Sequence, residues 1–136
     1  MSSFLQVSGL RVHYGVIEAV KGIDLNLQRG KITALLGANG AGKSTTLLAL
    51  SGLLSAAGGA VIFDGVELQN LPSHQIVAKG LVQVPEGREI LTALTVRENL
   101  LLGAYRRRHD GDVDSDLERL LELLGRLFFL ICKAEP

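Results

Sequence analysis

The chain has 136 residues, of which 47% are hydrophobic and 21% are charged, and its 14 basic residues balance its 14 acidic residues. This length suits one domain with a core of its own, and because aromatic residues make up only 4%, we expect that core to be aliphatic. A formal net charge of 0 argues against a general electrostatic grip on nucleic acid, so no nucleic-acid partner is expected.

The cysteine count, the N-terminal residues and the lengths of the apolar runs indicate a reducing compartment. The single cysteine, Cys132, cannot form a disulfide within the chain. The N-terminal residues lack the basic and apolar regions of a signal peptide. No apolar run approaches the roughly 20 residues that cross a bilayer, so we expect a cytoplasmic protein.

Strand patterns dominate the first third of the chain. Alternating or nearly alternating apolar residues predict two half-buried antiparallel strands over residues 4–14 and 16–27. The continuous apolar run over 31–37 predicts a strand that is covered on both faces. Helical spacing begins at Lys43 and ends near Gly52.

The pattern continues with short elements and then changes at Pro85. Residues 58–68 predict two strands around a turn at Asp64-Gly65. Residues 72–80 predict a short helix with Gly80 as its C-cap, and 81–85 predict another apolar strand that Pro85 ends.

Helical signals dominate after Pro85. Thr95 and Glu98 fit a capping box at the start of a helix. Residues 111–116 read as a polar linker, and Ser115 and Glu118 predict a second capping box. This order indicates a mixed α/β body followed by a helical part.

A glycine-rich loop stands between the strand predicted over 31–37 and the helix from Lys43. Its residues fit the phosphate-binding pattern G-x-x-x-x-G-K-[ST], a P-loop. Glycines let the backbone N–H groups curl around phosphate oxygens, and the helix adds its positive N-terminal dipole. Lys43 then reaches the β- and γ-phosphates, the Ser44 hydroxyl binds Mg²⁺, and Thr45 bonds the α-phosphate. The predicted nucleotide-binding residues of the loop are Gly37, Asn39, Gly40, Ala41, Gly42, Lys43, Ser44, Thr45 and Thr46. The alternative is a glycine-rich turn before an ordinary helix.

The stretch GANGAGKSTT over 37–46, preceded by a strand pair that carries Tyr14, resembles the ATP-binding subunits of ABC transporters. In that family an aromatic residue at the place of Tyr14 stacks on adenine. The resemblance therefore implies stacking by Tyr14, and the alternative is a plain strand aromatic.

A second marker is LVQVPEGREILTALTVRENLLLG over 81–103. The family has Val-Pro-Gln followed by a loop and Leu-Thr-Val-x-Glu-Asn-Leu, and its Gln contacts Mg²⁺ and the attacking water. Glu86 stands at that place, and Glu followed by Gly-Arg is similar to the branched-chain amino-acid importer ATPases. The resemblance implies that Glu86 binds Mg²⁺ directly or through water, and the alternative is a solvated loop acid. We interpret Gln83 as a surface residue of the strand.

The resemblance implies an α/β fold of the P-loop NTPase, ABC ATPase type. It has an N-terminal antiparallel β subdomain, the start of a helical subdomain and an incomplete parallel sheet. We expect residues 1–136 to form a single, C-terminally truncated nucleotide-binding domain, with an α/β body over 1–86, the helical start over 87–127 and an atypical tail over 128–136.

Family motifs that carry the chemistry are not found in the 136 residues. These are the Leu-Ser-Gly-Gly-Gln signature, the Walker B strand ending in Asp-Glu, and the switch His. We therefore expect no turnover by this chain alone. We also interpret it as a shortened or frame-shifted product, the alternative being a natural small ATP binder. We expect that the strands over 31–37 and 81–85 are not neighbours in the sheet. Each strand would then have unpaired backbone N–H and C=O groups, so we expect low stability and a tendency to associate.

The function implied by the resemblance is the ATP-binding component of an ABC transporter of the branched-chain amino-acid importer type. ATP and Mg²⁺ are the implied ligands. The implied partners are membrane-spanning permease subunits and a second ATPase subunit, on the inner face of the cell membrane. The alternatives are a Mg-nucleotide-binding fragment without hydrolysis, or an ATPase of another ABC branch.

Overall fold

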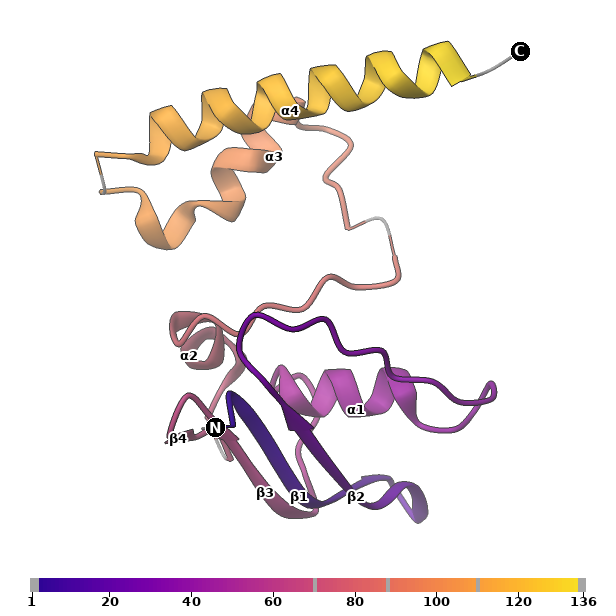
Figure 1. The fold of residues 1–136 in the computed structure, drawn as a ribbon. Coiled ribbons are helices and arrows are strands. Elements are labelled where there is room, and N and C mark those ends of the chain that lie inside the picture. Colours follow the sequence, from indigo (N-terminus) through magenta and orange to yellow (C-terminus); the bar gives the residue numbers. More distant parts are fainter. Residues whose placement is uncertain (1–2, 70, 88, 110, 135–136) are drawn as a thin grey trace. The chain divides into compact units, whose positions relative to one another are not determined.

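A computed structural model describes residues 3–69, 71–87, 89–109 and 111–134 (Figure 1). The chain divides into two compact units, Met1–Val84 and Pro85–Pro136.

A four-stranded antiparallel sheet forms the frame of the first unit (Figure 1). Its strands are β1 (Leu5–Tyr14), β2 (Ile17–Leu27), β3 (Gly58–Phe63) and β4 (Val66–Glu67), in the spatial order β2-β1-β3-β4. The two long strands and the hairpin at Asp64-Gly65 confirm the predictions from alternation and turn chemistry. Both pairings of β1 are antiparallel, with register shifts near Ser8.

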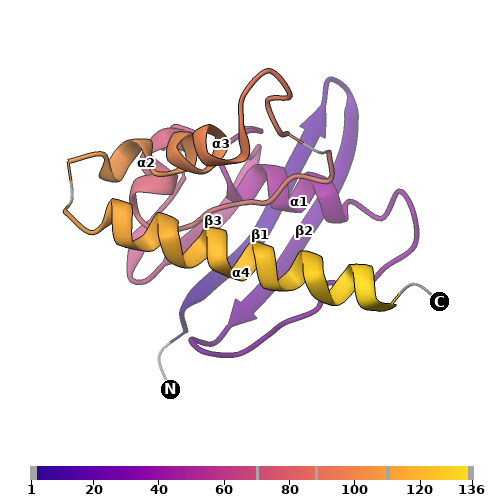
Figure 2. The ribbon, with the colours of Figure 1, turned by 90° about the horizontal axis from the view of Figure 1, so that it is seen from above.

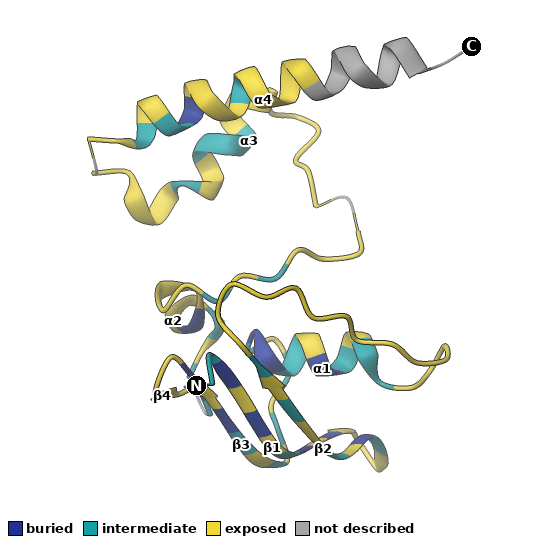
Figure 3. Cartoon of the chain, viewed as in Figure 1, coloured by how far each residue is buried: buried dark blue, intermediate teal, exposed yellow. Residues whose placement is uncertain are grey.

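The core of the first unit lies on one face of this sheet. Leu5, Val7, Leu10 and Val12 of β1 are buried, as are Leu50 of α1 (Lys43–Leu50) and Ile76 of α2 (Ser73–Ala78). The cluster of buried residues is completed by Val20, Val61, Phe63 and Leu68. Figures 2 and 3 show α1 beside the sheet and the buried positions along β1. Only Phe63 in this cluster is aromatic, so the expected aliphatic core is confirmed.

Two predicted strands are wrong. Residues 31–37 and 81–85 have no regular secondary structure, and neither segment joins a sheet ladder within the described residues. Ile32 is 103% exposed and Val84 is 88% exposed. An extended segment becomes a strand only when neighbouring strands accept and donate its backbone hydrogen bonds. Each apolar run therefore has the composition of a buried strand, but the described residues supply no partner strand for it.

The helices of the first unit end close to their predicted positions. α1 ends at Leu50 with Ser51 as its cap, and Gly52 follows with φ +72°, which confirms an end near Gly52. α2 ends at Ala78, and Lys79 rather than Gly80 is its C-cap. Gly80 is the next residue, with φ +98°, the left-handed conformation that commonly follows a helix end.

The second unit consists of helices. Thr95 caps α3 (Val96–Gly103), and the predicted capping box is confirmed, since the Thr95 N–H donates to Glu98 Oε2 at 2.7 Å and the Glu98 N–H donates to Thr95 Oγ1 at 3.2 Å. A single 3-10 turn, η1, covers Tyr105–Arg107. The second helix, α4, spans Val113–Ala134.

The second predicted capping box, at Ser115 and Glu118, is wrong, and so is the linker from Val113 onward. Ser115 already lies inside α4, and its hydroxyl donates to the Asp112 carbonyl at 2.9 Å. Asp114 and Asp116 occupy the first turn, where carboxylates interact favourably with the helix dipole. The helix therefore begins two residues before Ser115, with both acids in its first turn. Within the described residues, none of the helices combines the length and apolar composition that crossing a bilayer requires.

Candidate functional site

The glycine-rich loop connects the segment 31–36 to α1 and is held in a tight curl. Gly40 and Gly42 have φ values of +81° and +87°, and the Ala41 N–H donates to the Ala38 carbonyl at 3.1 Å. A Cβ atom on Gly42 would lie 2.8 Å from the Ala19 carbonyl oxygen and 3.2 Å from Val20 Cγ2. Glycine is therefore required at 42 both by the backbone conformation and by the close approach of β2.

Lys43 folds back across this loop. Its ammonium donates to the Gly37 carbonyl at 2.8 Å and to the Ala38 carbonyl at 2.7 Å. An ammonium has three N–H donors, so the two bonds leave one donor to face a ligand while the loop keeps its curl. The cation is thus fixed at the first residue of α1.

The N-terminus of α1 has the electrostatics of an anion site. Its first turn contains no acidic residue, and Gly42 provides no side-chain cap. The partial positive charge of the helix end is therefore not offset from within the helix. Ser44 is exposed in this turn and Thr45 is half-buried.

Thr46 has a different place from the other loop residues. Its side chain is only 2% exposed, and its hydroxyl donates to the Gly42 carbonyl at 2.8 Å. Thr46 stabilises the turn from inside the unit, and its direct contact with a nucleotide stays a prediction. Gly37, Asn39, Gly40 and Ala41 lie together on the exposed part of the loop.

Tyr14 lies at the end of β1 and is 47% exposed. Its partner across the β1–β2 hairpin is Ile17. Ala19, which approaches Gly42, follows Ile17 by two residues, or about 7 Å along the strand. The strand register therefore brings the hairpin tip that carries Tyr14 close to the glycine-rich loop.

A cavity of about 470 Å³ borders the loop. Its walls come from β2, from the segment before the loop and from the loop itself, and they are Ala19, Val20, Lys21, Ile23, Leu35, Leu36, Gly40, Ala41, Lys43 and Thr46. Aliphatic walls with two lysines suit an anionic ligand that also has an apolar part.

The predicted metal ligands are divided between the two units. Ser44 belongs to the first unit and Glu86, which is exposed, belongs to the second. Their joint action on a metal therefore stays a prediction. In the part of the chain that the structure describes, no group of three or more His, Cys, Asp or Glu side chains is placed to hold a metal ion.

The interpretation of Gln83 as a surface strand residue is wrong. Gln83 is half-buried and outside any sheet, and its Oε1 atom accepts a hydrogen bond from the Ser51 hydroxyl at 2.6 Å. The two residues are 32 positions apart. No local sequence pattern signals a pair at that separation.

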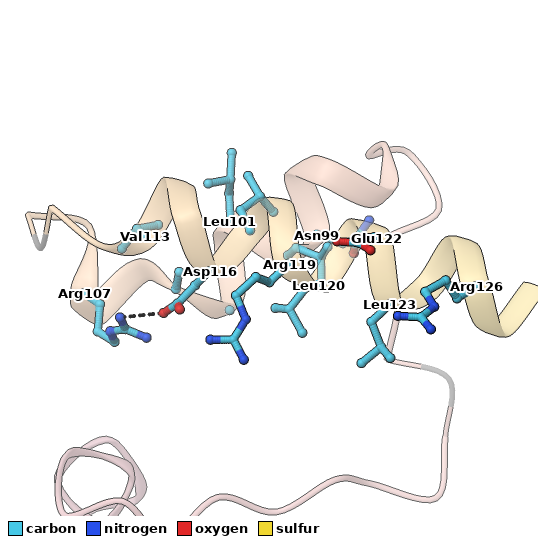
Figure 4. Close-up of a pocket in the computed structure, with 14 residues that line it drawn as sticks. Asn99, Leu101, Arg107, Val113, Asp116, Arg119, Leu120, Glu122, Leu123 and Arg126 are labelled. Atoms are coloured by element: carbon cyan, nitrogen blue, oxygen red, sulfur yellow. Dashed lines mark hydrogen bonds and ion pairs between the residues drawn. The ribbon is translucent and has the colours of Figure 1, made fainter.

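A larger cavity, of about 770 Å³, lies between α3 and α4 (Figure 4). Arg107 donates to Asp116 at 2.7 Å at its edge, and Figure 4 shows Leu120 and Leu123 among the aliphatic side chains that line it. None of the predicted site residues lines this cavity. The nucleotide hypothesis therefore does not involve this cavity.

Comparison with known proteins gives matches along most of the chain. The sequence model of the family described as "ABC transporter" matches residues 20–133. The high-affinity branched-chain amino acid transport ATP-binding protein BraG of Pseudomonas aeruginosa is 42% identical over 127 residues, which are 93% of this chain and 53% of BraG. LivG of Escherichia coli K12, with the same description, is 34% identical over 107 residues, which are 79% of this chain and 42% of LivG. The chain spans about half or less of the length of these relatives.

Solved structures match as well. The ATP-binding cassette MJ1267 of an ABC transporter is 29% identical with a TM-score of 0.69, over 76% of this chain and 41% of that protein. The ATP-binding cassette MJ0796, bound to ADP and Pi in a post-hydrolysis state, has a TM-score of 0.74 over 89% of this chain and 56% of that protein. At 23% identity this second match shows the fold alone. Both agree with the predicted fold class.

Proposed function

Because the chain belongs to the ABC transporter family, we propose that it binds ATP through residues 37–46 as the energy-coupling component of an importer of branched-chain amino acids. The observation that carries this proposal is the curl of the glycine-rich loop around Lys43. Its ammonium is fixed by the Gly37 and Ala38 carbonyls at the uncapped N-terminus of α1. Backbone N–H groups, a helix dipole and a cation then converge on one phosphate group.

The donors at the loop fit Mg²⁺ as the metal of the bound nucleotide. Ser44 presents a hydroxyl oxygen in the exposed first turn of α1, and Mg²⁺ prefers a few protein oxygens combined with substrate phosphates. The bound ion would neutralise charge on the phosphate oxygens. Ser44 would hold it from the first unit, and we propose Glu86 as its second ligand, directly or through water.

Adenine recognition falls to Tyr14. The β1–β2 register supports this role, because it brings the hairpin tip close to Gly42, and the ring is about half exposed. Stacking of an aromatic ring on a base contributes about 1–3 kcal/mol without reading its hydrogen-bonding edge.

Hydrolysis of ATP is the reaction of the ABC ATPase family. In this proposal, the chain supplies the elements that bind the phosphates. The 136 residues contain no Leu-Ser-Gly-Gly-Gln signature and no Walker B strand. We propose that this chain alone binds Mg-ATP without turnover, because a general base and the signature's contacts with the developing phosphate charge are both needed.

The similarity to BraG and LivG supports branched-chain amino acids as the transported substrates. In such a transporter, ATP would lie between two ATPase subunits, and their closure would act on membrane-spanning permease subunits. These partners would hold the chain on the inner face of the membrane.

A second candidate is the ATPase of another ABC importer. The ribose import ATP-binding protein RbsA 1 of Streptomyces avermitilis is 36% identical over 125 residues, which are 89% of this chain and 24% of RbsA 1. The ATP site would be the same in both cases, and only the permease partner would differ.

Phosphate release under multiple-turnover conditions, measured beside binding of a fluorescent ATP analogue, tests the proposal. We expect saturable binding of the analogue that unlabelled ATP displaces, with phosphate release at background. Phosphate release that persists through purification and disappears in Lys43→Ala would show that the chain carries a complete catalytic site. Absence of displaceable binding would overturn the assignment of the loop.

A further inference from the structure

Helix α4 presents an apolar patch at the cavity of the second unit. Leu117 is buried, whereas Leu120 and Leu123 are 45% and 52% exposed. Figure 4 shows both exposed leucines projecting to the same side of the helix as Arg119. The described residues that line this cavity all belong to the second unit. The patch is therefore a feature of that unit by itself.

Residues of opposite charge stand at the two ends of this patch. Asp116 precedes Leu120 by four residues, and Arg126 follows Leu123 by three. These spacings keep the four side chains on one side of an α-helix. Asp116 accepts a hydrogen bond from Arg107 at 2.7 Å, which holds its carboxylate at the edge of the cavity. A carboxylate can accept about four hydrogen bonds, so a second cation can bind there.

The charges and the leucines are centred on nearly the same point of the helix. Asp116 and Arg126 are ten residues apart, about 15 Å along the axis, and their midpoint is Leu121. The midpoint of Leu120 and Leu123 lies about 1 Å further along. An antiparallel copy of the helix, turned about this point, would set leucine against leucine. It would also set Asp116 of each copy against Arg126 of the other.

We propose that this face of α4 binds the same face of a second copy of the chain in antiparallel orientation. The contact consists of two Asp116–Arg126 ion pairs around the leucine patch. A parallel arrangement would set Asp116 against Asp116 and Arg126 against Arg126, so the charges select the antiparallel one. The contact lies in the second unit and needs no nucleotide, so it is independent of the proposed function.

The size and symmetry of the contact define the expected assembly. Residues 113–126 extend about 21 Å along the helix, which is short for a protein interface. We therefore expect a weak dimer that dissociates on dilution. Because each copy uses the same face, association closes at two copies.

Sedimentation equilibrium of the full chain without nucleotide, at low ionic strength, tests the contact by charge exchange. The unchanged chain should show a monomer–dimer equilibrium. Asp116→Arg and Arg126→Asp should each raise the dissociation constant by about tenfold or more, since each change replaces attraction by repulsion at two places. A mixture of the two variants should form a heterodimer about as tight as the dimer of the unchanged chain, because opposite charges again meet at both ends.

Asp114→Arg is the matched control. It makes the same charge change in the same first turn of α4, but Asp114 lies about 200° around the helix from Asp116 and does not line the cavity. This variant should dimerise like the unchanged chain. Added salt should weaken the dimer, because it screens exposed ion pairs, whereas it does not weaken association through exposed apolar segments.

Four results would overturn the proposal. The unchanged chain could remain monomeric at all concentrations, or it could form assemblies larger than a dimer that survive salt. The single variants Asp116→Arg and Arg126→Asp could associate as tightly as the unchanged chain. Their mixture could stay as weakly associated as each variant alone, which would trace the losses to damage within each chain. Finally, Asp114→Arg could lose as much affinity as Asp116→Arg.

Discussion

Replacing Gly42 with alanine, beside the same change at Gly40, tests whether the curl of the phosphate loop depends on contact with β2. Both glycines have left-handed backbone conformations, with φ values of +87° and +81°. A Cβ atom on Gly42 would lie 2.8 Å from the Ala19 carbonyl oxygen, whereas a Cβ on Gly40 would meet no atom within 4 Å. The two substitutions therefore share the backbone strain and differ in the clash.

The magnitudes follow from these two terms. An alanine in the left-handed region costs about 1–2 kcal/mol in the folded state. The smaller conformational freedom of alanine in the unfolded chain offsets about 0.4–1 kcal/mol of this cost, equally in both variants. Overpacking against the backbone carbonyl of Ala19 adds about 1–3 kcal/mol at Gly42 alone. We expect Gly42→Ala to lower the free energy of unfolding by at least about 1 kcal/mol more than Gly40→Ala.

Urea unfolding of the two variants and the unchanged chain measures this difference, and ATP titration shows whether the loop keeps its function. Gly42→Ala should lose more stability and more ATP affinity than Gly40→Ala. Equal losses of unfolding free energy in the two variants would show that β2 does not limit the space at Gly42.

Three further predictions concern the base, a helix cap and the exposed apolar segments. Tyr14→Ala should weaken ATP and GTP alike by about 1–3 kcal/mol in calorimetry, with Tyr14→Phe nearly silent, and equal harm from both changes would rule out stacking. Hydrogen bonds from the Thr95 backbone N–H and hydroxyl lower the pKa of Glu98 from its ordinary 4.5. The capping box therefore stabilises α3 at pH values above the pKa that Glu98 has in the unfolded chain. This stabilisation is lost as the pH falls through the pKa that Glu98 has in the folded chain. Amide exchange in α3, corrected for intrinsic rates, should therefore accelerate on acidification in the unchanged chain but not in Glu98→Gln, which lacks the titrating carboxyl, and an identical response in both would contradict the role of the box. Residues 31–37 and 81–84 should make the chain weakly stable and prone to associate, and a monomer in sedimentation that melts cooperatively above about 60 °C would contradict this.

Local patterns predicted the elements that depend on neighbours in the chain. The β1–β2 pair and the turn at Asp64-Gly65 follow from alternation and from turn residues, and their partners are adjacent in sequence. The box at Thr95 and Glu98 is a four-residue pattern, and it forms as expected. The glycine-rich loop and the helix that follows it could be predicted because the glycines, the lysine and the helix are contiguous in sequence.

Features that depend on distant partners could not be predicted in this way. The apolar run over 31–37 has the composition of a buried strand, yet it lacks a partner strand within the described residues and lies exposed. The hydrogen bond between Ser51 and Gln83 joins residues 32 positions apart, so the interpretation of Gln83 as a surface residue of a strand had no local pattern to correct it. At α4, the capping pattern of Ser115 and Glu118 predicted a later start, whereas the helix begins at Val113 with Asp114 and Asp116 in its first turn.

Calorimetric titration with Mg-ATP measures whether Lys43 binds nucleotide phosphate. Lys43→Ala removes the cation that the Gly37 and Ala38 carbonyls orient, and Lys31→Ala removes an equal charge from an exposed position before the loop. Loss of the charge-assisted contacts should weaken ATP by at least about 1.5–3 kcal/mol, or roughly 10- to 150-fold. We expect this loss in Lys43→Ala and unchanged affinity in Lys31→Ala. Equal ATP affinity in the unchanged chain and Lys43→Ala would contradict it.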